Sequence, residues 1–591
     1  MKGCAKKPVS RLQHNVNTPD GVRGGGSPFT TVTYSPLSAS SKKNDPDAPS
    51  KAGQIVYTYG SAKLLKKFSW LPTTTDDGNE PITIDDDISP GDRNKRTTSG
   101  NRGKGIGFSI KATQFVNESC KYMFDSSYDR VMILGDRIYE CGNAICKRFG
   151  LELITPKSHE LQDNVESDVK AISSTSLDTL NSVKEEPVGD ATDIEREEDI
   201  YSSWFEGVKV HHVDYPSSEP IRVLGRIVVE SSSTATNSST TSSDKQTQTS
   251  KLSIVDFDEH TLRYTRLDLS KVQVPAWWSL FPGQTVLLEG INPRGTLFSV
   301  KQIQCERTLT LPRVPSSLDK TLTVVIGSAP FTDRDDLLYE KLSSLLVYCS
   351  NNPPDVLILT GPFADANCKL YTEVAETFDE YFEKIISTIM NSIGSHTEVF
   401  VVAHHDDLVS SFVYPTAPYK VASFYKNLHF LPDPCVFSIE GLEIGVTTVD
   451  VIKHLIESEC TAANVNGSVP PFGSDKIKRA YGHLFHQASF YPLNPPPEDV
   501  PLDVDMLNEF GRLSRIPNIM ICPSALNRYV REINGCICVN PGFVDGHSSD
   551  GSYARLIIQP PEVDEQQQKE SQSAALYPSP ASYIACQIVK T

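Results

Sequence analysis

Several features that would assign this chain to a common protein class are missing from its sequence. No run of apolar residues is long enough to cross a bilayer, and no membrane association is expected. Met1–Arg23 is basic and polar without an apolar core, which argues against a secretory signal. The 13 cysteines include no C-x-x-C pair; the nearest two, Cys536 and Cys538, are two residues apart. A zinc site of its own is therefore not expected, and the thiols favour a reducing compartment, the nucleus or the cytosol.

An excess of basic residues is also missing. The net charge is −18, and a negative field of this size repels nucleic acid phosphates. The chain as a whole is therefore a poor candidate for tight autonomous DNA binding, and we expect weak or indirect contact with DNA. A length of 591 residues exceeds what one ordinary core holds, so we expect two or three domains with linkers between them.

The N-terminal third is predicted to be mostly unstructured. Residues 1–105 are rich in Ser, Thr, Pro, Gly and Asp and show no sustained period, so we predict a disordered tail. Three Ser-Pro dipeptides in it are candidate phosphorylation sites: Ser27, Ser35 and Ser89. A basic cluster over 93–104 is either a nuclear import signal or a solvated stretch.

Two shorter segments follow the tail. Apolar residues recur at three- and four-residue steps over 128–149, so residues 106–156 are predicted to form a short helical and extended segment that packs on the core. Residues 157–217 are acidic and of low complexity, which is typical of a linker.

The pattern changes to short strands over 218–312. Apolar and β-branched runs alternate with glycines, and a Ser/Thr-rich stretch over 231–250 reads as a disordered insert. Several short strands broken by glycine favour a small Greek-key barrel of the oligonucleotide-binding (OB) type, with a small sandwich as the alternative. Trp277 and Trp278 beside it are either an interface anchor or a plug in the barrel core.

From 318 to 591 the chain alternates between strands and helices. Buried strand runs at 322–326, 355–360 and 398–403 are separated by helical stretches, which predicts parallel βαβ units. An open α/β sheet places its chemistry at the carboxyl ends of its strands. Those ends carry Ser328, Ala329, Pro362, Asp365, His404, His405, Asn540 and Gly542.

The order of these positions resembles the calcineurin-like metallophosphoesterase fold, whose motifs are D-x-H, G-D-x-x-D, G-N-H-[DE] and G-H-x-H. Two metal ions in that fold need carboxylate and imidazole ligands. Here Ser328 and Ala329 stand at the first motif, Pro362 replaces the bridging aspartate of the second, and only Asp365 survives. Asn540 and Gly542 carry no histidine pair. We therefore predict a degenerate, non-catalytic phosphoesterase domain without metals.

The tandem histidines leave two interpretations open. His404 and His405, helped by Asp406 or Asp407, are either a residual metal site or part of a polar loop. Because the neighbouring strand ends offer no further carboxylates, the polar loop is the preferred interpretation.

A barrel in front of a degenerate phosphoesterase domain resembles the B subunits of replicative DNA polymerases, and the local motifs resemble the polymerase α branch. The residues that carry the resemblance include Leu280–Gln284, Gly327–Thr332, Pro354–Asp365, Ser489–Pro496 and Cys536–Gly542.

The resemblance implies an α+β multidomain scaffold subunit of the primosome, located in the nucleus and without a cofactor. The implied partners are the zinc-bearing C-terminal domain of the polymerase α catalytic subunit and, through the complex, the small and large primase subunits. Three alternatives remain: the B subunit of another replicative polymerase, an active metallophosphoesterase, or an independent single-strand DNA binder that uses the barrel.

Overall fold

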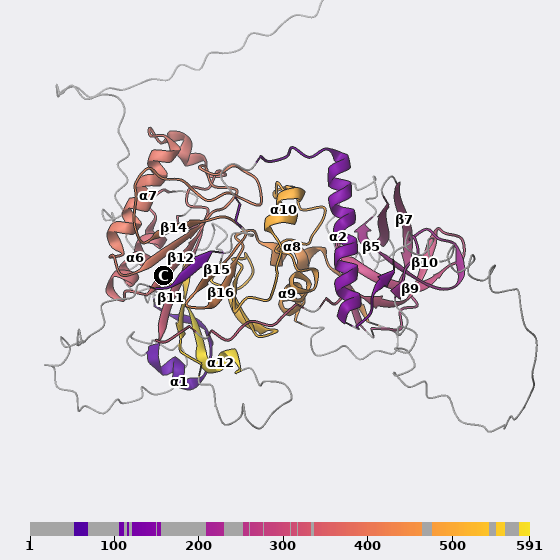
Figure 1. Cartoon of the computed structure of the whole chain (residues 1–591). Coiled ribbons are helices and arrows are strands. Elements are labelled where there is room, and N and C mark those ends of the chain that lie inside the picture. Colours follow the sequence, from indigo (N-terminus) through magenta and orange to yellow (C-terminus); the bar gives the residue numbers. More distant parts are fainter. Residues whose placement is uncertain are drawn as a thin grey trace, which may run out of the picture.

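The computed structural model describes residues 53–68, 106–110, 115–116, 121–148, 150–154, 208–229, 252–258, 261–275, 277–307, 309–315, 317–332, 336–463, 475–542, 551–561 and 578–591. These residues form a smaller barrel lobe and a larger α/β lobe (Figure 1). Ser27, Ser35, Ser89 and the predicted insert 231–250 lie outside the described residues, as does most of the predicted linker 157–217.

The barrel lobe is a closed barrel of five strands in the order β10-β7-β6-β5-β9. The strands are β5 (Ser217–Val229), β6 (Leu252–Asp258), β7 (Thr261–Asp268), β9 (Thr285–Asn292) and β10 (Leu297–Gln304). A parallel pairing of β10 with β7 closes the ring, which removes the open edges that a sandwich would leave. Trp278 is 4% exposed within the barrel core, so this tryptophan is core rather than an exposed anchor.

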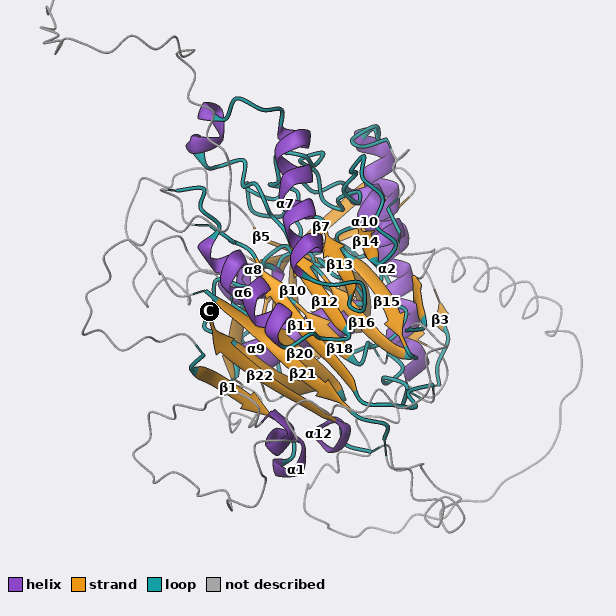
Figure 2. Ribbon diagram, turned by 90° about the vertical axis from the view of Figure 1, so that its left-hand side faces the viewer, coloured by secondary structure: helices purple, strands orange, loops and turns teal. Residues whose placement is uncertain are grey.

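The larger lobe is built on two packed sheets (Figure 2). The seven-stranded sheet has the order β1-β22-β21-β11-β12-β13-β14, and its four strands from β11 to β14 run parallel, as the alternation of strands and helices predicts. Its members are β1 (Ile55–Tyr59), β22 (Ile584–Lys590), β21 (Ser552–Ile558), β11 (Leu322–Ser328), β12 (Val356–Thr360), β13 (Glu398–Val402) and β14 (Leu428–Leu431). Helices α6 (Glu340–Asn351) and α7 (Phe378–Ser392) pack on its outer face.

The second sheet has six strands in the order β19-β20-β18-β16-β15-β2. They are β19 (Tyr529–Ile533), β20 (Cys536–Asn540), β18 (Ile519–Ile521), β16 (Leu442–Val446), β15 (Cys435–Ile439) and β2 (Phe108–Ile110). Helices α8 (Val451–Ser458) and α9 (Lys476–Gln487) pack on its far side, while its inner face shares one apolar core with the first sheet. The lobe thus has four layers, helix, sheet, sheet and helix.

Two stretches are ordered where the sequence predicts a disordered tail or a linker. Within the predicted tail 1–105, residues 53–68 are ordered: β1 pairs antiparallel with β22, and Leu64 and Phe68 are buried next to Ile557. Within the predicted linker 157–217, Val208, Val210 and Val213 are buried against the barrel lobe. Both stretches are short and take their stability from partners elsewhere in the chain, which local composition cannot reveal.

The two lobes are joined by strand pairing and by a long helix. Strand β8 (Trp277–Leu280) pairs antiparallel with β17 (Cys460–Ala463) of the larger lobe. Helix α2 (Ser127–Arg148) lies between the lobes and contacts β5, β6 and β9 of the barrel as well as α10 (Val504–Phe510) (Figure 1). None of the helices that the structure describes has the length and hydropathy that a bilayer crossing requires.

Candidate functional site

The predicted site residues of the first three motifs meet at one edge of the seven-stranded sheet. Ser328 ends β11, while Pro362 and His404 each lie two residues beyond the ends of β12 and β13. The register pairs Ser328 with Thr360 and Thr360 with Val402, so these ends are direct neighbours. We call residues 329–332, 361–367 and 403–410 the strand-end loops.

A buried carboxylate, Asp407, holds the strand-end loops together. Its Oδ2 accepts hydrogen bonds from the backbone N–H of Phe363 (2.5 Å) and Ala364 (3.4 Å) and from the hydroxyl of Tyr419 (3.0 Å). Burial raises the pKa of Asp407 to about 6, although these hydrogen bonds act in the opposite direction. The sequence offered Asp406 and Asp407 together and did not distinguish them; only Asp407 is fully buried.

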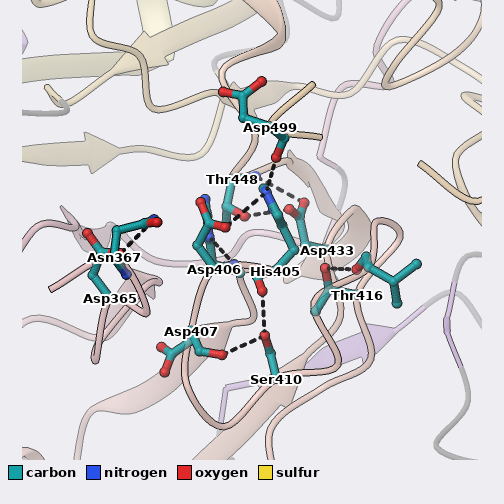
Figure 3. Close-up of polar contacts among 12 residues, drawn as sticks. Asp365, Asn367, His405, Asp406, Asp407, Ser410, Thr416, Asp433, Thr448 and Asp499 are labelled. Carbon is teal, nitrogen blue, oxygen red and sulfur yellow. Dashed lines mark hydrogen bonds and ion pairs between the residues drawn. The ribbon is translucent and has the colours of Figure 1, made fainter. Parts of the chain in front are cut away.

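The two histidines are packed into the same edge. Their rings stack with centroids 4.5 Å apart, and His404 Nδ1 accepts the backbone N–H of Asp406 at 3.0 Å. His405 Nε2 lies 3.2 Å from the carbonyl oxygen of Asp499 and 3.5 Å from Asp406 Oδ1 (Figure 3). Burial, and then the neighbouring His405, lower the pKa of His404, so its ring is neutral at physiological pH.

Asp365, the one surviving acidic position, belongs to a turn. Its Oδ1 accepts the backbone N–H of Asn367 at 2.8 Å and the side-chain amide at 3.1 Å (Figure 3). This is an Asx-type turn, in which the carboxylate caps its own loop.

The residues of the last motif lie at the carboxyl end of strand β20 of the second sheet. Asn540 ends β20 in the second sheet, and its Oδ1 accepts the N–H groups of Ser524 (3.1 Å) and Gly542 (3.0 Å). Its side-chain amide donates to the carbonyl of Leu526 at 3.2 Å, so Asn540 fastens a loop. Gly542 lines a small pocket together with Ser328.

The donor set does not suit two divalent ions. Proline at 362 offers no ligand, and Asp407 Oδ2 is already engaged by three donors. Four atoms at this edge are buried without a hydrogen-bond partner among the described residues: Ser328 Oγ, Thr360 Oγ1, His405 Nδ1 and Asp407 Oδ1. One carboxylate oxygen, one imidazole and two hydroxyls are too few to hold a binuclear centre. The described part of the chain contains no group of three or more His, Cys, Asp or Glu residues placed to bind a metal.

Comparison with known proteins places two parts of the chain in one family. The family model for the B subunit of DNA polymerase alpha/epsilon matches residues 324–531, and that for the OB domain of the DNA polymerase alpha B subunit matches residues 205–305. The chain belongs to the family of DNA polymerase alpha/epsilon B subunits. The second match also gives the closed barrel its type, and it begins ahead of the predicted boundary at 218.

Curated relatives of this family are named as B subunits of DNA polymerase alpha. The Drosophila melanogaster protein is 45% identical over 283 residues, 48% of this chain and 45% of the relative. The Mus musculus protein is 30% identical over 368 residues (59% and 56%), and the Schizosaccharomyces pombe protein 29% over 374 residues (59% and 61%). The chain thus spans about half the length of the curated relatives that it matches.

Among solved structures, a mutant of Vps29 from Entamoeba histolytica aligns over 46% of this chain and 99% of its own length. The sequence identity is 11% and the TM-score 0.18, a score too low to decide the fold.

A second buried carboxylate in this member of the family, Asp433, was not recognised from the sequence as a site residue. Its Oδ1 accepts the backbone N–H of Thr448 at 2.9 Å, and its Oδ2 accepts the Thr448 hydroxyl (Figure 3). Burial raises the pKa of Asp433 to about 7.

A buried polar network joins the two lobes. Glu459 Oε2 accepts hydrogen bonds from the Ser279 hydroxyl of β8 (3.0 Å) and from Nε of Arg479 (3.1 Å). His483 Nε2 lies 3.0 Å from the same hydroxyl, and burial lowers the pKa of His483 to about 3. Because Glu459, Ser279 and His483 are buried and Arg479 is partly buried, the network fixes how the lobes dock.

Proposed function

We propose that this chain is a non-catalytic scaffold subunit of the DNA polymerase alpha–primase complex. In this proposal it binds the C-terminal domain of the catalytic subunit, and through the complex it supports the synthesis of RNA–DNA primers that initiates replication. The relatives are named as subunits of DNA polymerase alpha, and that name supports assembly with a catalytic chain.

The proposal rests on one observation: polar residues at the strand ends hold the fold together. The larger lobe has two stacked sheets with strand ends gathered at one edge, as expected for an inactivated calcineurin-like phosphoesterase domain. At that edge Asp407 accepts backbone N–H groups and Asn540 fastens a loop, so residues that could serve chemistry serve structure. Such a lobe, fixed to a barrel by β8 and β17, offers a rigid composite surface that suits a permanent partner.

Co-purification tests the partner assignment. The full chain, tagged and expressed with the catalytic subunits of polymerases alpha, delta and epsilon in separate cultures, is expected to retain only the alpha chain, together with both primase subunits when these are present. Retention of the delta or epsilon chain instead would assign the protein to another replicative polymerase.

A phosphodiesterase assay tests the absence of catalysis. Purified chain with Mn²⁺ and a generic phosphodiester is expected to show no turnover above that of the His405→Ala variant. Turnover that the variant abolishes would establish an active metallophosphoesterase.

Three further parts of the proposal have separate tests. Nuclear location is tested by imaging a fluorescent fusion. Phosphorylation at Ser27, Ser35 and Ser89, which would add charge to the tail, is tested by mass spectrometry across the cell cycle. Weak, salt-sensitive DNA contact is tested by titration with single-stranded oligonucleotides, where nanomolar binding at physiological salt would contradict it.

A further inference from the structure

A small positively charged pocket lies where α2, the barrel and α10 meet. It encloses about 50 Å³, and we call it the arginine pocket. Its lining combines three arginines with apolar side chains, among them Arg137, Arg226, Arg512, Ile133, Leu502 and Leu507. No Asp or Glu is among its described lining residues.

Arg226 is the unusual member of this pocket. It lies on β5 and is 9% exposed, and its Nε and Nη1 are buried without a hydrogen-bond partner among the described residues. Burial lowers the pKa of Arg226 to about 10, which still leaves the guanidinium charged at neutral pH. Buried charges in proteins are normally paired, because an unpaired one costs free energy.

The carboxylate of Glu140 on α2 pairs with the other two arginines of the pocket. Glu140 Oε2 lies 3.0 Å from Nη1 of Arg137 and 2.8 Å from Nη1 of Arg512. Arg137 also donates to the carbonyl oxygens of Gln487 (2.8 Å) and Ala488 (3.1 Å). The positive charge of Arg226 is therefore left for a group from outside the pocket.

The walls of the pocket are held from both lobes. The side chain of Gln487 accepts the backbone N–H of Thr285 at 2.9 Å and donates to the Thr285 carbonyl at 3.2 Å. The N–H of Asn494 donates to the carbonyl of Pro282 at 3.1 Å. A preorganised pocket loses little entropy when it binds a ligand.

We propose that the arginine pocket binds the side-chain carboxylate of an aspartate or glutamate presented by a partner polypeptide. The size of the cavity decides against a nucleotide, because pockets for such ligands measure roughly 300–1,000 Å³. A nucleic acid phosphate carries a sugar on each side and cannot enter a small cavity, whereas a carboxylate ends its side chain and can. Ile133, Leu502 and Leu507 would pack against an apolar neighbour of the acidic residue.

Methyl NMR of the full chain tests the proposal. The probes are N-acetyl-Glu-Leu-amide, its Gln counterpart and inorganic phosphate, each titrated at constant ionic strength. The methyl signals of Ile133, Leu502 and Leu507 are expected to shift saturably with the Glu probe and at least tenfold more weakly with the Gln probe. Arg226→Met is expected to weaken Glu-probe binding at least tenfold, and Arg226→Lys, which keeps the charge without the planar fork, by less.

Arg222→Met is the matched control, because Arg222 lies on the same strand but pairs with Glu289. It is expected to leave binding of the Glu probe unchanged. The melting temperature separates a ligand site from a structural arginine: Arg226→Met is expected to raise it by about 1 °C, since an unpaired buried charge is removed.

Three outcomes would overturn the assignment. Equal binding of the Glu and Gln probes would leave an apolar groove without charge recognition. Tighter binding of phosphate than of the Glu probe would make the pocket a phosphate site. A lowered melting temperature in Arg226→Met with unchanged probe binding would make Arg226 structural.

Discussion

The strand-end loops and the arginine pocket each bury a charged side chain, but they differ in the hydrogen-bond partners that the chain provides for it. Asp407 Oδ2 in the loops receives three hydrogen bonds from its own chain, while Asp407 Oδ1 has no partner among the described residues. Arg226 in the pocket has two buried nitrogens without a partner among the described residues. Hydrogen bonds from the chain's own groups offset part of the cost of burying a charge, whereas a buried charge without such partners lowers stability until a ligand arrives. The strand-end loops therefore hold their buried charge with groups of the chain itself, whereas the arginine pocket at the lobe junction leaves a buried charge for a ligand.

Removing the satisfied carboxylate should have the largest effect. Asp407→Ala leaves the N–H groups of Phe363 and Ala364 unpaired in the core, so we expect a loss of about 3 kcal/mol or more in the free energy of unfolding. Asp407→Asn, which keeps an acceptor, should lose less, and the exposed Glu373→Ala should lose almost nothing. Urea denaturation measures all three; an Asp407→Ala chain as stable as the parent would show that Asp407 does not hold the loops.

The second-largest effect is expected in the buried polar network that joins the lobes. Glu459→Gln removes the charge opposite Arg479 while keeping the shape of the side chain, and we expect a cost of about 2 kcal/mol. Hydrogen exchange should show faster exchange in β8 and β17, whose pairing joins the lobes. Glu457→Gln, an exposed change on α8, is the control. Unchanged exchange in both strands would mean that the network does not fix the docking of the lobes.

The pH dependence of stability tests the second buried carboxylate. The folded-state pKa of Asp433 is about 7, above its ordinary value of 3.8, so the folded protein retains a proton that the unfolded chain has released. Its contribution to stability is fully present below about pH 4 and is lost as the pH rises through 7, with a slope of at most about 1.4 kcal/mol per pH unit.

Asp433→Asn should remove this slope. Urea midpoints of the parent and of Asp433→Asn between pH 5 and 8 should converge or cross as the pH rises, because only the parent loses stability through Asp433. The exposed Asp319→Asn is the control. Parallel curves for the parent and Asp433→Asn would show that Asp433 does not titrate in this range.

The smallest effect is expected at the unsatisfied charge. In Arg226→Met the unfolding free energy should rise by up to about 1 kcal/mol, opposite in sign to the loss in Asp407→Ala. Denaturation of the free chain measures it, with Arg222→Met as the control. A loss of stability in Arg226→Met would mean that Arg226, like Asp407, stabilises the fold.

Sequence periodicity predicted the helices and strands whose own residues show a clear apolar repeat. The strands of the barrel, the parallel strands β11 to β13 and helix α2 lie close to the predicted ranges, because their apolar periods are intrinsic. Strand β1 was missed because its partner β22 lies more than 500 residues away. The helical stretch predicted between β12 and β13 is divided into a 3-10 turn over Lys369–Glu373 and helix α7, whose N-cap is Thr377.

The sequence predicted where the candidate site lies but not what its residues do there. Counting from the ends of parallel strands placed Ser328, Pro362 and His404 at one edge, since neighbouring strands end together. What Asp407 and Asn540 do depends on donors such as the Tyr419 hydroxyl and the Ser524 N–H, which come from other loops. No spacing rule connects those residues, so the structural use of the site emerged only from the three-dimensional contacts.

Calorimetric titration of the full chain with Mn²⁺ tests most directly whether the strand-end loops serve structure alone. No saturable heat is expected at millimolar metal, and His405→Ala should give the same trace as the parent. Binding of two ions per chain that is lost in His405→Ala would contradict the account.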